Sequence, residues 1–205
     1  FVARGEQSRM AQPPTQPAPP WTPPARVVLV EPEIPNNTGS VARTCVATGS
    51  ALHLVHPLGF DIDEKACRRA GLDYWPRVNL TEHADLAAWE ASLPAPNPGP
   101  NAPGVWLFTA RAARPIFDAP VRPGDYLVFG RESVGLPADL LDRHKDRLVS
   151  IPLVPGERSL NLSNAVAVAV YELVRKMIVS GAAGIDGSGR LTAASTGVRP
   201  ICADD

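Results

Sequence analysis

Cysteine is scarce in this sequence, and its arrangement argues against two kinds of site. The 205 residues include three cysteines, Cys45, Cys67 and Cys202, and no two of them form a CxxC pair. An odd number of widely spaced cysteines argues against a disulfide framework and against a zinc site. We therefore expect no bound metal and a reducing compartment, the cytoplasm.

Long apolar runs and an excess of charge of one sign are also missing. No stretch approaches the roughly 20 apolar residues of a membrane-spanning helix, and the N-terminus lacks the order of a signal peptide. We therefore expect no membrane partner. The net charge is −1 and the pI is about 6.5, so any binding of nucleic acid would depend on a local basic patch.

The glycine-rich signatures of common nucleotide-binding loops do not occur either. GxGxxG does not follow the first expected strand, and GxxxxGK[ST] is absent. The sequence therefore gives no support for a dinucleotide-binding fold or a P-loop nucleotide-binding protein.

Proline, in contrast, is abundant but confined to two stretches. Of the 23 prolines, seven lie between Pro13 and Pro24 and five between Pro94 and Pro103. The first stretch has almost no apolar periodicity, whereas the chain beyond Ser180 is rich in Gly, Ala and Ser. We expect a disordered extension over residues 1–25, one domain over 26–179 and a flexible tail over 180–205.

Between the extension and the tail, short β-branched runs alternate with helical patterns. This alternation predicts an α/β fold with a parallel sheet and with ligand-binding loops at the carboxyl ends of the strands. Apolar residues at spacings of three and four predict a long amphipathic helix near the C-terminal end of the domain. The expected strands are 26–31, 52–60, 105–109, 125–129 and 148–151, and the expected helices are 38–48, 65–70, 84–92, 137–141 and 160–177.

Three segments that follow expected strands are rich in residues that shape backbone or bind polar ligands. They are EPEIPNNTGSVARTC (31–45), FGRESVGLP (129–137) and IPLVPGERSLNLSNAVAVAVYELVRK (151–176). Taken singly, Arg43 reads as a solvated arginine and Glu132 as a carboxylate that caps a turn. Four polar residues crowd the start of the last helix, which exceeds what helix capping needs and favours a ligand or an interface.

Taken together and in this order, the segments resemble the SpoU branch of the SPOUT methyltransferases, and within it the small TrmL type. The resemblance spans roughly Val27 to Lys176 and is carried by EPEIPNNTG, RTC, TGSALHLVHPLGF, KACRRAGLDYW, GDYLVFG, E plus GLP, and LNLSNAVAVAVYE. It implies a C-terminal deep trefoil knot and a homodimer in which each active site borrows residues from the partner. It also implies S-adenosylmethionine as cofactor and 2′-O-methylation of the wobble nucleotide 34, cytidine or uridine, of tRNA.

Two other interpretations stay open beside this one. One is a 2′-O-methyltransferase for rRNA or another tRNA position, and the other is a non-catalytic RNA-binding dimer of the same fold. The compact length favours the wobble enzyme over rRNA-directed relatives, which often carry an additional RNA-binding domain. Intact Arg43, Glu132, Ser163 and Asn164 argue against a non-catalytic protein.

The resemblance also implies roles for individual residues. The implied catalytic residues are Arg43, Asn37, Glu132, Ser163 and Asn164, and the implied cofactor-binding residues are Thr109, Ala110, Gly130, Glu132, Ile151, Ser159 and Leu160. Arg131 stands where many relatives have proline, which leaves open the local loop shape and whether Arg131 makes a cationic contact to RNA.

The mechanism proposed for the family implies that Arg43 accepts the proton of the ribose hydroxyl. A guanidinium group is a donor and ordinarily does not accept a proton. In an equally physical version, Arg43 holds the adjacent phosphate and stabilises alkoxide charge, while Ser163 or water relays the proton.

A local cationic surface can bind the RNA backbone even in a protein of neutral overall charge. The expected RNA contacts are Lys65, Arg68 and Arg69, with Arg111 or Arg114 as additions, and the alternative is a solvated helix face. We expect packing or turn roles for His53 and His56, and either base stacking or burial for Tyr74 and Trp75.

Overall fold

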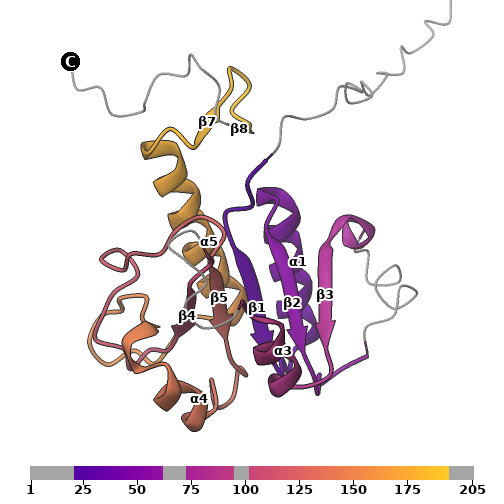
Figure 1. Ribbon diagram of the computed structural model, residues 1–205, viewed down its shortest axis with the longest axis vertical. Helices are drawn as coiled ribbons and strands as arrows, with labels where there is room; N and C mark the ends of the chain where they lie inside the picture. Colours follow the sequence, from indigo (N-terminus) through magenta and orange to yellow (C-terminus); the bar gives the residue numbers. More distant parts are fainter. Residues whose placement is uncertain (1–20, 62–72, 95–101, 194–205) are drawn as a thin grey trace, which may run out of the picture.

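Six parallel strands form the central sheet of the computed structural model, which describes residues 21–61, 73–94 and 102–193 (Figure 1). The strand order is β3-β2-β1-β5-β4-β6, and every neighbouring pair is parallel. The expectation of an α/β fold with a parallel sheet is confirmed. The strands are β1 (Arg26–Val30), β2 (Ala51–Val55), β3 (Asn79–His83), β4 (Val105–Phe108), β5 (Tyr126–Phe129) and β6 (Leu148–Val149).

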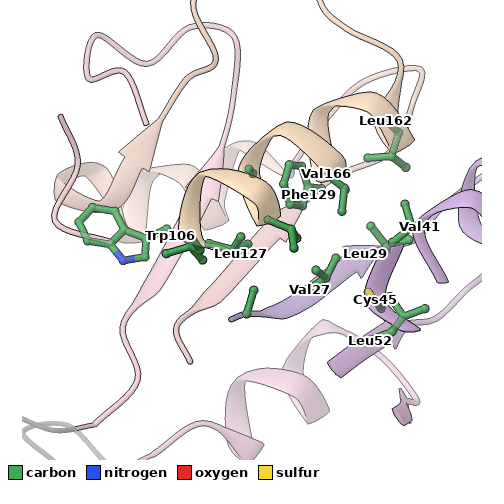
Figure 2. Close-up of a cluster of buried hydrophobic side chains, with 14 of the residues drawn as sticks. Val27, Leu29, Val41, Cys45, Leu52, Trp106, Leu127, Phe129, Leu162 and Val166 are labelled. Carbon is green, nitrogen blue, oxygen red and sulfur yellow. The ribbon is translucent and has the colours of Figure 1, made fainter. Parts of the chain in front are cut away.

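Helices cover both faces of the sheet, so the central strands are apolar on both sides. The first strand shows why: Val27 and Leu29 face a cluster formed with α1 (Pro35–Thr48) and α5 (Leu162–Val179). Val28 and Val30 face the opposite cluster, which contains residues of α3 (Leu86–Ser92) and α4 (Ala138–Arg143). Figure 2 shows Leu162 and Val166 of α5 beside the sheet in the first cluster.

Local signals set the ends of the two long helices. Pro35 occupies the first turn of α1, where its missing N–H costs nothing, and Gly49 ends the helix with a φ of 71°. Asn161 caps α5 by accepting hydrogen bonds from the N–H groups of Ser163 and Asn164. Among the described residues, the connections of the sheet also contain the short 3-10 helices η1 (Trp75–Arg77) and η2 (Lys145–Arg147).

The edge strand β3 differs from the sequence expectation, which placed no strand there. Its residues, NLTEH, are exposed or half-buried except for His83, because β3 lies at the edge of the sheet and pairs with β2 alone. An edge strand carries polar side chains and lacks the apolar run that identifies a central strand. The expected strand 52–60 is also shorter in the structure, where β2 ends at Val55 before the turn at Pro57.

The ends of the domain reach further than the sequence patterns indicate. Trp21 donates from Nε1 to the carbonyl oxygen of Thr48 at 2.9 Å, and Ala25 is fully buried. A two-stranded hairpin of β7 (Ala183–Ile185) and β8 (Leu191–Ala193) follows α5 and lies beyond its C-terminal end (Figure 1). The Asp186 carboxylate, which accepts bonds from Ser188 and Arg190, holds the turn, so the expected flexible tail contains an ordered element.

Two kinds of feature do not occur in residues 21–61, 73–94 and 102–193. No helix in these ranges has the length and apolar character needed to cross a membrane. The same ranges contain no group of three or more His, Cys, Asp or Glu side chains that would hold a metal ion.

A pair of histidines lies between β2 and β3. His53 Nδ1 is 3.0 Å from His83 Nε2, and the His53 ring packs edge-on against Tyr126. Burial, together with the nearby charges of His83 and Arg26, lowers the pKa of His53 to about 4. The expectation that His53 has a packing role agrees with this environment.

We predict that His53 makes the stability of the fold depend on pH. The unfolded chain takes up the proton near pH 6.5 and the folded chain only near pH 4, so acidification through this window favours unfolding. The free energy of unfolding of His53→Gln should therefore fall less than that of the wild type between pH 6.5 and 4. Chemical denaturation at several pH values measures this slope. His56→Gln, outside the pair, is the control, and an unchanged slope in His53→Gln would contradict the prediction.

Candidate active site

The Glu132 carboxylate joins the loop after β5 to the loop after β1. It accepts hydrogen bonds from the N–H of Glu33 at 2.9 Å, the N–H of Ile34 at 3.3 Å and Nδ2 of Asn37 at 2.9 Å. No side chain of the loop before α1 caps this helix, and its first turn contains no acidic residue. Glu132 therefore brings a negative charge to the N-terminal end of α1, where the helix dipole favours it.

Asn37 passes this connection on to the start of α5. Its side chain is 7% exposed, and its Oδ1 accepts from Nδ2 of Asn161 at 2.9 Å. Asn161 Oδ1 in turn accepts from Ser163 Oγ at 2.7 Å. The bonds thus run in one direction, from Ser163 through Asn161 and Asn37 to Glu132. Because the Ser163 proton points to Asn161, the lone pairs of the hydroxyl remain available to accept a hydrogen bond from a ligand.

Gly130 begins a narrow turn that brings Glu132 to this position. Arg131 and Gly135 exchange backbone hydrogen bonds of 3.2 and 2.9 Å, which close the turn. A Cβ on Gly130 would lie 2.2 Å from the carbonyl carbon of Gly135 and 2.3 Å from the nitrogen of Leu136. Only glycine fits at this position, the neck of the turn, because the atoms that a Cβ would contact belong to the backbone.

The cofactor residues expected from sequence follow the carboxyl ends of three adjacent strands. Leu107 of β4 pairs with Val128 of β5, so Thr109 and Gly130, two residues further along each strand, lie at the same level. On the other side, the Thr109 N–H donates to Val149 of β6 at 3.0 Å. Ala110 directly follows Thr109, and Ile151 lies two residues after Val149. These positions therefore meet at one end of the sheet, at the side of the Glu132 network.

The segment between β6 and α5 offers both apolar and backbone groups to a ligand. Every residue from 152 to 161 is exposed, including Ser159. Leu153, Val154 and Leu160 are 36, 69 and 38% exposed. Exposed apolar side chains in one loop are typical of a ligand-binding segment, and together with backbone N–H and C=O groups they suit an adenine ring and its polar edge.

Arg43 lies on the exposed side of α1, away from this end of the sheet. The rise of an α-helix places it about 9 Å along the axis from Asn37. Its guanidinium stacks on the Tyr74 ring at 4.8 Å from the centroid, and the Tyr74 hydroxyl donates to the carbonyl of Gly39 at 2.8 Å. Tyr74 is 4% exposed, so of the two roles expected for it burial is confirmed.

The structure does not place all of the expected RNA contacts. Lys65, Arg68 and Arg69 lie outside the described residues. Arg111 is exposed, whereas Arg114 donates to the carbonyl of Asp146 at 3.2 Å.

Arg131 makes a contact within the protein. Its guanidinium pairs with the Glu31 carboxylate, which joins the loop after β5 to the end of β1.

Two residues of the network were absent from the sequence-based set of site residues. Asn161 stood out only as one of several polar residues before a helix, and its function as an N-cap is the signal that identifies it. Glu33 accepts from the N–H and Oγ of Ser133 at 2.9 and 2.7 Å, and no local pattern indicates this contact across about 100 residues.

Comparison with known proteins gives a consistent set of matches. The model of the SpoU rRNA Methylase family matches residues 24–171. A protein of Burkholderia ambifaria named tRNA (cytidine(34)-2'-O)-methyltransferase is 47% identical over 158 residues, which cover 77% of this chain and 98% of that protein. A protein of the same name from Escherichia coli strain K12 is 44% identical, over 76% of this chain and 96% of its own length.

A solved structure, described as "Structural insights into the 2-OH methylation of C/U34 on tRNA", matches in fold and sequence. It has a TM-score of 0.66 and 45% identity and covers 75% of this chain and 95% of that one.

Replacement of Gly130 tests the neck of the turn. We expect Gly130→Ala to lower the free energy of unfolding by about 2 to 3 kcal/mol, because backbone atoms must move to admit the methyl group. Gly187→Ala, in the turn between β7 and β8, is a matched control because a Cβ there meets nothing within 4 Å. Urea denaturation compares the two variants, and equal stabilities would refute the steric argument.

Replacement of Asn37 tests the amide link. Asn37→Asp removes the donor to Glu132 and sets two carboxylates against each other, which should cost about 2 to 3 kcal/mol of unfolding free energy. Asn79→Asp, at an exposed position of β3, makes the same chemical change without a partner to lose. The prediction fails if both variants unfold at the same urea concentration.

Proposed function

Because this chain belongs to the SpoU rRNA Methylase family, we propose that it is an S-adenosylmethionine-dependent 2′-O-methyltransferase acting on the wobble nucleotide 34, cytidine or uridine, of tRNA. The single observation that carries the proposal is the network from Ser163 to Glu132, which gathers expected catalytic residues at one end of the sheet. The assignment of the substrate is supported by relatives that share 44–47% identity with this chain over nearly their whole length. We also propose that the enzyme meets its tRNA in the cytoplasm, as expected for a tRNA-modifying enzyme.

The cofactor would lie across the carboxyl ends of β5, β4 and β6. Gly130, Thr109 and Ile151 would meet it with backbone groups, and Leu160 would cover its adenine. When bound, S-adenosylmethionine supplies an electrophilic methyl group on a sulfonium. In-line transfer requires the acceptor oxygen to be collinear with this group, so rigid positioning by these loops supplies much of the rate acceleration.

Ser163 and Arg43 would act on the ribose side of the reaction. The Ser163 hydroxyl donates to Asn161 and can accept a hydrogen bond from the ribose hydroxyl through its free lone pairs, which orients the ribose oxygen, while water takes the proton that this hydroxyl loses. Arg43 would hold the neighbouring phosphate and stabilise negative charge on the ribose oxygen. We give the guanidinium this electrostatic role because it ordinarily does not accept a proton.

We also propose a homodimer, in which Arg43 of one subunit reaches the cofactor site of the partner. Two features support it: the distance of Arg43 from Asn37 along α1, and an exposed stripe on α5 that includes Val168 and Tyr171, 39 and 51% exposed. We further propose that the chain forms a trefoil knot. In its support, the segment after the outer strand β6 returns to the centre of the sheet, where Asn161 bonds to Asn37.

The direct experiment is methyl transfer from labelled S-adenosylmethionine to separate pools of tRNA and rRNA. We expect label in tRNA, at position 34. Arg43→Ala should reduce transfer at least a hundredfold, the range for loss of an electrostatic catalyst. Its affinity for the cofactor, measured by calorimetry, should stay within about twofold.

Two outcomes would contradict parts of this account. Label in rRNA alone, or in neither pool, would refute the proposed substrate. Equal loss of cofactor affinity and transfer in Arg43→Ala would refute the assignment of Arg43 to the ribose side. Lys145→Ala, which removes a cation from an exposed pair with Asp142, should leave both quantities unchanged.

A further inference from the structure

Glu31 has an unusual backbone conformation at the end of β1. Its φ is 51°, and it is the non-glycine residue with positive φ among the described residues. This region is strained for side chains other than glycine, and such strain persists only where the surroundings enforce it. The N–H of Glu31 donates to Val55 at 2.9 Å, and its carboxylate contacts the Arg131 guanidinium. The carboxylate oxygen in that contact, Oε2, is buried.

The contact matters because Arg131 directly follows Gly130. The turn from Arg131 to Gly135 is closed by its own two backbone bonds, so its internal shape does not depend on the segment after β1. Its orientation relative to the sheet depends on side chains. Three consecutive ones bind the segment after β1: Arg131 to Glu31, Glu132 to the start of α1, and Ser133 to Glu33.

We propose that the Glu31–Arg131 ion pair is a positioning device that sets the orientation of the Gly130 backbone toward the cofactor. The inference rests on the proposed function for the identity of that cofactor. Glu31 and Arg131 do not touch the cofactor in this account; they act through Gly130. Without the pair, Glu132 and Ser133 still hold the turn to the segment after β1, so the fold survives, while Gly130 loses the restraint next to it and shifts relative to the cofactor.

Two variants at position 31 distinguish a positioning role of the ion pair from an effect on the stability of the fold. Glu31→Gln removes the charge and leaves the shape. Glu31→Gly removes the carboxylate and at the same time relieves the strained φ, so it should unfold at a temperature equal to or above that of Glu31→Gln. A purely structural role would make ligand affinity follow the unfolding temperature.

The experiment is calorimetric titration of the full chain with S-adenosylhomocysteine, accompanied by thermal unfolding without ligand. We expect about tenfold weaker binding in Glu31→Gln, Glu31→Gly and Arg131→Met, and no further loss in Glu31→Gln/Arg131→Met, because either change already breaks the pair. Arg131→Lys, which keeps the charge, should recover part of the affinity. In the wild type and Arg131→Lys, higher salt should weaken binding more than in the variants without the pair.

The matched control is the exposed Asp139–Arg143 pair on α4, where Asp139→Asn and Arg143→Met should leave affinity unchanged. If Arg131→Met does not fold, the two Glu31 variants and Arg131→Lys decide the matter. Wild-type affinity in Glu31→Gln and Glu31→Gly, or additive losses in the double variant, would overturn the positioning role alone. Failure of the wild type to bind S-adenosylhomocysteine would overturn the proposed function, and the positioning role with it.

Discussion

The carboxylate of Glu132 is the contact on which the geometry of this site depends. It lies near the N-terminal end of α1, where backbone N–H groups of Glu33 and Ile34 and the helix dipole favour a negative charge. Through Asn37 it reaches Asn161, the N-cap of α5. A single anion thus connects the starts of the two helices that cover one face of the sheet. Loss of the Asn161 amide would leave the oxygen of the buried Asn37 side chain without this partner, which is costlier than never having made the bond.

The parallel sheet explains why three distant segments can meet in this way. The carboxyl ends of parallel strands all lie at the same end of the sheet. The loops after β1, β5 and β6 therefore converge there, although about 100 residues separate the first two. The close approach also needs a narrow turn after β5, which Gly130 alone permits. Packing then makes the arrangement rigid, because the apolar residues of α1 and α5 pack on each other and on the strands below.

Much of this fold was predictable from the sequence, and the reasons are local. The apolar run RVVLV predicted β1, and the three- and four-residue spacing from Leu162 to Met177 predicted most of α5. The edge strand β3 was missed because its polar residues resemble a loop, and the β7–β8 hairpin was missed because its strands have three residues each. Short strands carry too little periodicity to be identified.

The residues of the site, like the elements of the fold, were predicted from the sequence only in part. Glu132 and Asn37 were identified as site residues by resemblance, yet no pattern in the sequence indicated that they bind each other or that Asn161 completes the network. The contact between Arg131 and Glu31 likewise joins residues that are far apart in sequence, and no sequence pattern indicated it. Pairings of this kind depend on the tertiary structure, which places the loops, and not on spacing along the chain.

The most direct test of the network is the coupling free energy between Glu132 and Asn161, which do not bond to each other but share Asn37. Urea denaturation of Glu132→Ala, Asn161→Ala and the double variant gives this quantity. We predict a coupling of about 1 kcal/mol or more, which disappears when the same cycle is measured in an Asn37→Ala background. Additivity within about 0.3 to 0.5 kcal/mol in the wild-type background would contradict the account, because Glu132 and Asn161 would then act independently.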